Sequence, residues 1–240
     1  MTDQEKQEQI FSQLNDGTIT QEDLKSLVAI LWKKYKANRK SLLFYIEWYA
    51  YNEMFKRLTL SQFSEIGNSD ENENKKNCIS EEFHNTKLFI ETINKTIETE
   101  LQKGDITDPK FYGQPDTGFK FSIDTLVHII LRHNPAVKSF ISTDANALGD
   151  DPSSLTSALF SPILAMLMAL DAVEDDDWKE SDGKNLICNF QSGDQKYTLV
   201  RRGTSNKIIS FYPNNNQDIS YIELEREPDK MRFIKKQTSI

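Results

Sequence analysis

The spacing of the apolar residues changes once along this chain, and that change constrains its fold more than any other feature. Up to residue 173 apolar side chains recur every three or four positions, as Leu24, Leu27 and Leu31 do, which is typical of helices. From residue 185 onward they alternate as in strands. We therefore predict strands over 185–190, 196–201, 207–212, 220–226 and 231–235.

Short polar links join these predicted strands, and such links favour an antiparallel meander. Helices followed by a sheet define an α+β fold. The sequence predicts an N-terminal helical domain, followed by helices packed on a curled antiparallel β-sheet.

The boundary between the two parts is predicted at Gly104, which would end a long helix that Ser80 begins. This places a helical domain at 1–104 and an α+β domain at 105–240. Residues 67–77 are polar throughout and are expected to form a solvated loop. In the second part we expect an extended piece at 119–121, then helices over 123–133 and about 155–173.

Composition excludes several classes of protein. The longest apolar run, 163–170, falls short of the roughly 20 residues that span a bilayer, and the N-terminus lacks a signal-peptide pattern. Cys78 and Cys188 have no metal-ligand spacing. We expect a soluble chain without metal or other cofactor that does not act at a membrane, cytoplasmic unless it is delivered into another cell.

The net charge of -8 argues against a protein that coats nucleic acid. Two interpretations remain open on charge alone. One is an enzyme with a local basic cleft, and the other is a protein that docks on a basic partner.

Two of the three histidines lie in the predicted helix 123–133, as His128 and His133. In an α-helix residues five apart point about 140° away from each other, so these two are not expected to share a face. His128 and Arg132, four apart, do share one. His133 would project from the helix end, which Asn134 and the following proline define. A structural role for a helix histidine is the commoner case.

A basic hairpin follows in the predicted sheet. It carries Lys196, Arg201, Arg202 and Lys207, with hydroxyl residues in and after its turn. Guanidinium groups grip phosphate through paired hydrogen bonds, which favours a phosphate site. Charge on an edge strand also protects a sheet from aggregation, and the hairpin itself does not choose between these roles.

The helix segment 121–135, which ends in His-Asn-Pro, followed late in the chain by Arg201-Arg-Gly-Thr and by Ser210-Phe-Tyr-Pro213, resembles the barnase/EndoU/colicin/RelE-like ribonuclease superfamily. The resemblance covers residues 106–236. Members of that superfamily often occur as toxin modules of bacteria and phages. The resemblance implies a metal-independent endoribonuclease that cleaves RNA, with tRNA among the candidates, by attack of the ribose 2′-hydroxyl.

Under that resemblance His133 is the general base or acid, and His128 is its counterpart or its support. Arg201, Arg202 or Lys207 would stabilise the phosphate charge, with Arg132 as a further substrate contact. The phosphate or sugar would be oriented by Thr204, Ser210 and Tyr212. A toxin of this kind would have a cognate inhibitor or immunity protein as partner. The helical half would serve delivery, dimerisation or self-inhibition, and the oligomeric state is left open.

Two alternatives remain. The acidic composition fits a non-catalytic binding protein, such as an immunity protein, antitoxin or adaptor, that docks on a basic partner. Arg201 with Glu223 or Glu225 fits, loosely, an ADP-ribosyltransferase. The sequence has no phosphate-binding loop, dinucleotide-binding glycine motif, zinc-protease motif or serine-hydrolase elbow.

Overall fold

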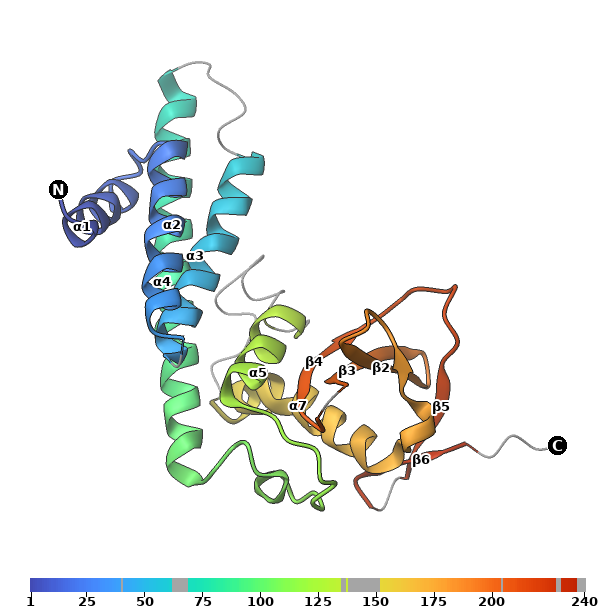
Figure 1. Cartoon of the computed structure of the whole chain (residues 1–240). Helices are drawn as coiled ribbons and strands as arrows, with labels where there is room; N and C mark the ends of the chain where they lie inside the picture. The colour runs from blue at the N-terminus through green and yellow to red at the C-terminus, as the bar shows by residue number, and fades with distance from the viewer. Residues whose placement is uncertain are drawn as a thin grey trace. The chain divides into compact units, whose positions relative to one another are not determined.

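The computed structural model of the chain describes residues 1–39, 41–61, 69–134, 137, 152–203, 205–227 and 230–236. Helices come first and a sheet last, which confirms the α+β class (Figure 1). The chain divides into two compact units. One contains residues 1–99, and the other contains residues 100–137 together with the chain from Ser153 onward.

The first unit is built from helices α1 (Asp3–Asn15), α2 (Gln21–Ala37), α3 (Leu42–Ser61) and most of α4 (Ser69–Lys103). Thr2 and Glu5 form a complete capping box at the start of α1. Gly17 follows α1 with a φ of 65° and lies against the backbone of Lys76, where a Cβ would come within 2.3 Å of the Lys76 carbonyl oxygen. A glycine is therefore required there for two reasons, its backbone conformation and the space.

The apolar stripes of these helices meet in one core. Its fully buried members come from α1 through α4 and include Leu14, Leu24, Leu27, Met54 and Ile79. The aromatic stretch of α3 contributes Tyr51 to this core and half-buried rings such as Trp48 around it. Packing against neighbouring helices thus accounts for the apolar face of α3.

The polar stretch 67–77 was predicted as a loop, and this prediction is wrong from Ser69 onward, because α4 already begins there. Glu and Lys favour helix although they carry no apolar pattern. Tertiary contacts hold the next turns: Gly17 packs on Lys76, Ile79 is buried, and the Ser80 hydroxyl donates to the Asn15 carbonyl over 2.8 Å. Ser80 therefore ties α4 to α1 instead of capping a helix.

In the second unit a 3₁₀ turn, η1 (Pro109–Tyr112), leads to α5 (Ile123–His128), which continues as a π-helical turn, η2 (Ile129–His133). Helix α7 (Pro152–Ala172) follows, with Pro162 in its interior. A second 3₁₀ turn, η4 (Asp175–Asp177), precedes the sheet. The strands are β1 (Lys179–Glu180), β2 (Asn185–Ser192), β3 (Gln195–Arg202), β4 (Ile208–Pro213), β5 (Ile222–Glu227) and β6 (Arg232–Lys235).

The five predicted strands correspond to β2–β6, and the sequence pattern missed the two-residue β1. The strand order is β4-β3-β2-β5-β6, with β1 also pairing with β2. β5 runs parallel to β2, with Phe190 opposite Ile222, so the sheet is mixed and not purely antiparallel as predicted. The link 214–221 crosses the sheet instead of making a tight turn, and the Tyr221 hydroxyl donates to the carbonyls of Asn214 and Asn216.

One face of the sheet is apolar and forms the core of this unit. Phe190, Leu199 and Phe211 are fully buried on it, and the rings of Phe190 and Phe211 stack. Helix α7 also contributes to the core, with buried residues from Leu155 to Leu170. Of the helices that the structure describes, one stretch, Leu155–Ala172, is long and apolar enough to cross a membrane, and half of it is buried inside the protein.

Candidate functional site

The site lies where the helix segment 123–133 meets β4, the outer strand of the sheet. Lys120 forms a single parallel bridge to Lys207: its amide donates to the Asn206 carbonyl over 2.9 Å, and its carbonyl accepts from Ile208 over 2.8 Å. The predicted extended piece at 119–121 thus exists as one bridging residue. Because α5 begins three residues later, this bridge sets α5 beside β4 (Figure 1).

The π-helical turn changes the relation between the two histidines. Hydrogen bonds that reach five residues back widen the turn, so residues five apart return to nearly the same direction. The Nε2 atoms of His128 and His133 lie 3.1 Å apart, within hydrogen-bond distance, and their rings meet edge to face at 4.9 Å between centroids. The prediction that these residues point apart is therefore wrong, because it assumed the α-helical period throughout.

A buried amide fixes the end of this turn. Asn134 leaves the helical conformation, and its Nδ2 donates to the carbonyl of Ala158 in α7 over 2.8 Å. That carbonyl has no backbone donor within its own helix, because residue 162, four positions later, is a proline without an N–H, and only the Ser161 hydroxyl reaches it from α7, over 3.5 Å. Pro162 and Asn134 thus complement each other, and the end of η2 is anchored to α7.

Tyr212 completes a cluster with the histidines. Its ring centroid lies 5.2 Å from that of His133. Across the sheet Tyr212 is opposite Thr198, and Thr198 is opposite Asn189, so the three side chains share one face. Thr198 donates to Asn189 Oδ1 over 2.6 Å and accepts from Asn214 Nδ2 over 2.8 Å.

A polar row therefore runs from His128 through His133, Tyr212 and Thr198 to Asn189. Sequence reasoning missed Thr198, Asn189 and Asn214. The signal that identifies Thr198 and Asn189 is strand register, because they lie level with Tyr212 only once β2, β3 and β4 are paired. Asn214 follows β4 and is identified by its hydrogen bond to Thr198.

The surroundings of His128 favour its neutral form. Burial, and secondly the positive charge of Arg132, lower the pKa of the His128 imidazole below its ordinary value. His128 is thereby kept neutral near pH 7, with a ring nitrogen able to accept a proton. Arg132 itself is exposed, so its guanidinium is accessible to a ligand at this end of the helix.

Arg201 is placed apart from this cluster. It lies three residues from Thr198 on β3 and so faces the opposite side of the sheet. Its guanidinium stacks over Trp178 at 4.6 Å and bonds Asn206 Oδ1 over 3.1 Å, and 11% of its side chain is exposed. Arg201 also pairs with Asp175 at 3.4 Å. Arg201 thus contacts Trp178, Asn206 and Asp175 within its own unit, and its guanidinium does not point at the histidines.

The other predicted site residues lie at different distances from this cluster. Ser210 lies two residues from Tyr212 on the same face of β4, and Arg202 is exposed on the corresponding face of β3. Lys207 is exposed just before β4. Thr204 lies outside the described residues. The structure thus brings His128, His133 and Tyr212 together, with Arg132 four residues from His128 and Ser210 two residues from Tyr212. Arg202 lies further away, four residues along β3 from Thr198, which corresponds to about 13 Å.

The pair proposed for ADP-ribosyl transfer is not brought together. Arg201 is opposite Leu186 and Glu223 is opposite Gln191, five residues further along β2, which corresponds to about 16 Å. Glu223 pairs with Lys236 at 3.1 Å.

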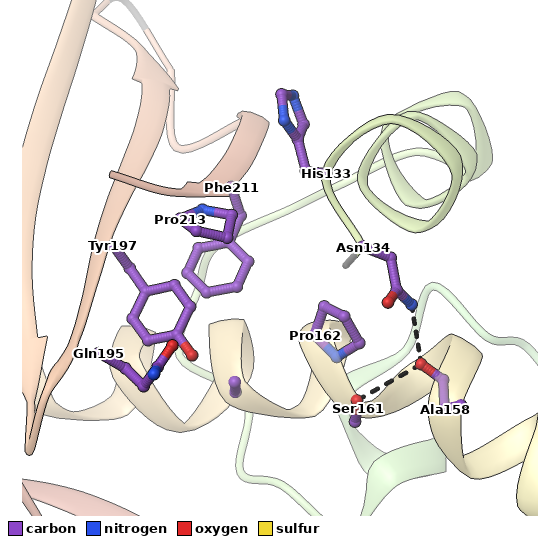
Figure 2. A pocket seen from close by; sticks show the side chains of 10 residues that line it. His133, Asn134, Ala158, Ser161, Pro162, Gln195, Tyr197, Phe211 and Pro213 are labelled. Atoms are coloured by element: carbon purple, nitrogen blue, oxygen red, sulfur yellow. Dashed lines mark hydrogen bonds between the residues drawn. The ribbon is translucent and has the colours of Figure 1, made fainter. Parts of the chain in front are cut away.

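A pocket of about 530 Å³ opens beside His133 (Figure 2). Its walls come from the end of η2, one side of α7 and the adjoining ends of β3 and β4. The residues that define it are His133, Ser161, Pro162, Gln195, Tyr197 and Phe211. His133 therefore belongs both to the polar row and to the rim of this pocket. Within the described ranges, no three His, Cys, Asp or Glu side chains lie close enough to hold a metal ion.

Comparison with known proteins returned no matching family model, no matching curated protein and no matching solved structure.

Proposed function

We propose that this protein is a metal-independent endoribonuclease that cleaves RNA by attack of the ribose 2′-hydroxyl on the adjacent phosphate. One observation carries the proposal: the π-helical turn joins His128 and His133 in one acid–base pair beside Tyr212 and an open pocket. Imidazole suits both proton transfers of this reaction, because its pKa lies near neutrality.

The proton balance assigns a role to each ring. His128, whose pKa is lowered, starts neutral and accepts the proton of the 2′-hydroxyl as its oxygen bonds to phosphorus. Protonated His133 gives its proton to the 5′-oxygen as the bond from phosphorus to that oxygen breaks. The products are a 2′,3′-cyclic phosphate and a free 5′-hydroxyl. His128 is then protonated and His133 neutral, and the 3.1 Å contact lets the proton return between them.

Charge and orientation come from the surrounding side chains. Negative charge that builds on the phosphate oxygens is stabilised by Arg132, which is close enough to lower the pKa of His128. Arg202 and Lys207 are exposed and attract the RNA backbone. The Tyr212 hydroxyl orients the phosphate, and Ser210 offers a second hydroxyl on the same face.

The experiment is cleavage of total RNA and of tRNA in EDTA, read on a denaturing gel. We expect cleavage by wild type and a loss of at least about 100-fold with His133→Ala or with His128→Ala, since each removes one proton transfer. His84→Ala is the matched control, because this third histidine is exposed on α4 in the other unit, and it should cleave like wild type.

Intact RNA with wild type across pH 6 to 8 would overturn the proposal. The acidic binding protein would then be the better interpretation.

A toxin-like ribonuclease also implies a cognate inhibitor. Its toxicity can be checked by expression in bacteria, where wild type should arrest growth and His133→Ala should not.

A further inference from the structure

The pocket beside His133 has the chemistry of a stacking site. Tyr197 and Phe211 form one wall, with ring centroids 5.1 Å apart and an interplanar angle of 19°, and Phe190 stacks behind Tyr197 at 5.3 Å. Figure 2 shows the rings of Tyr197 and Phe211 on one side of the pocket and Pro162 on the other, with His133 above. Phe190 and Phe211 are buried, so the platform is held rigidly by the core.

Polar groups lie at the rim of this apolar slot. Ser161 and Gln195 are exposed pocket residues, and between them they offer a hydroxyl and an amide. Such groups read the edge of a planar ring while its faces stack. None of the described residues that line the pocket is acidic, so a polyanion is not repelled there.

We propose that this pocket binds an unpaired nucleobase next to the scissile phosphate, stacked on the half-buried ring of Tyr197, which the buried rings of Phe211 and Phe190 support. The proposal rests on the ribonuclease function and specifies its substrate as single-stranded RNA. His133 links the two sites, since this residue lines the pocket while its imidazole, which points away from the pocket in Figure 2, contacts His128. A base in the pocket would therefore place its own phosphate close to the acid–base pair.

The shape of the pocket favours single-stranded RNA as the substrate. A base in a duplex is stacked on both faces and paired at its edge, so it reaches a pocket of this kind only when it is splayed out. Stacking on an aromatic platform is tolerant of base identity, and the Gln195 amide would add a preference for one base.

The test measures binding without cleavage. The ligand is a fluorescent single-stranded octamer of 2′-O-methyl RNA, which lacks the attacking hydroxyl, and a second octamer carries abasic sugars on the same backbone. Ser161→Trp fills the pocket. Ser157→Trp is its matched control, the same change at an exposed serine one turn away on α7 that does not line the pocket.

We expect Ser161→Trp to weaken binding of the normal octamer by about tenfold or more, with Ser157→Trp within twofold of wild type. The abasic octamer should bind wild type about as weakly as the normal octamer binds Ser161→Trp. Equal affinity of all three proteins, equal affinity for both octamers, or no binding by wild type would each overturn the base pocket.

Cleavage of unmodified RNA by the same proteins separates the two proposals. RNA cleavage that Ser161→Trp leaves unchanged would retain the ribonuclease and reject the pocket. Base-dependent binding without cleavage would retain the pocket and reject the ribonuclease.

Discussion

Arg201 and Arg202 are neighbours in the sequence but lie in different environments. Arg201 is held over Trp178 and Phe119 and bonded to Asn206, whereas Arg202 is exposed. From the sequence pattern, both arginines were given the same predicted role in binding phosphate. Strand alternation separates them, because adjacent residues face opposite sides of a sheet.

This difference gives a prediction for stability. Arg201→Ala removes a desolvated stacked cation and its hydrogen bonds, so we expect a loss of about 1–3 kcal/mol in the free energy of unfolding. Arg202→Ala should change stability by less than about 0.5 kcal/mol and weaken RNA binding instead. Urea unfolding of both variants measures the first effect. A larger loss for Arg202→Ala than for Arg201→Ala would contradict the assignment.

The pH dependence of cleavage should report on His128. As the proposed base it must be neutral, so activity falls as pH drops through its pKa, which burial and Arg132 hold below the usual value of about 6.5. Arg132→Gln removes one of these two causes, so the pKa should rise and the acid limb of the profile should move to higher pH. NMR titration of the His128 ring checks this shift independently of activity.

Arg226→Gln removes the same charge from an exposed site on β5 and is the control. It should leave the His128 titration in place. An unchanged His128 titration in Arg132→Gln would show that Arg132 does not act on this imidazole.

At the scale of elements, the π-helical turn depends on a complementary pair from two helices. Asn134 donates to the Ala158 carbonyl that Pro162 leaves without a backbone N–H donor. Asn134→Ala should therefore cost about 1–3 kcal/mol of stability, because the Ala158 and Leu159 carbonyls lose the donor that the buried amide supplies. It should also reduce cleavage, since the end of η2 is released.

A double-mutant cycle tests this complementarity. In a Pro162→Ala background residue 162 supplies its own N–H to Ala158, so Asn134→Ala should cost clearly less than in the wild-type background. The free energy of unfolding by urea gives all four values. Equal costs in the two backgrounds would show that the two residues are not coupled.

In the helical unit, Gly17 makes a similarly close contact between two elements, because it lies against the backbone of Lys76. Gly17→Ala should destabilise the protein by at least twice as much as Gly113→Ala. Both glycines have a positive φ, 65° and 71°, but a Cβ at Gly17 meets the Lys76 backbone and one at Gly113 meets nothing. The positive φ alone costs about 1–2 kcal/mol. Thermal unfolding compares the two, and similar losses would contradict the proposed contact.

Over the whole molecule, periodicity was enough to predict the α+β class and the positions of β2–β6. It failed where tertiary contacts decide local structure. The start of α4 has no apolar pattern, yet Gly17 and Asn15 pack against its early turns. The parallel pairing of β5 with β2 likewise depends on a crossover that strand spacing does not reveal.

The sequence predicted which residues form the candidate site, but it did not predict how their side chains are arranged. His128, His133 and Tyr212 were singled out by residue type and order. Their contact depends on one π-helical turn, and a pattern read at 3.6 residues per turn places the two histidines on different faces. Thr198 and Asn189 needed the strand register before they could be recognised.

The chemistry of the cleaved ends tests the central claim most directly. A short single-stranded RNA is incubated with wild type in EDTA, and the product ends are identified by mass spectrometry. We expect a 2′,3′-cyclic phosphate on one fragment and a 5′-hydroxyl on the other, with no cleavage at positions that carry a 2′-O-methyl group. Fragments that end in a 3′-hydroxyl and a 5′-phosphate, or RNA that stays intact, would contradict it.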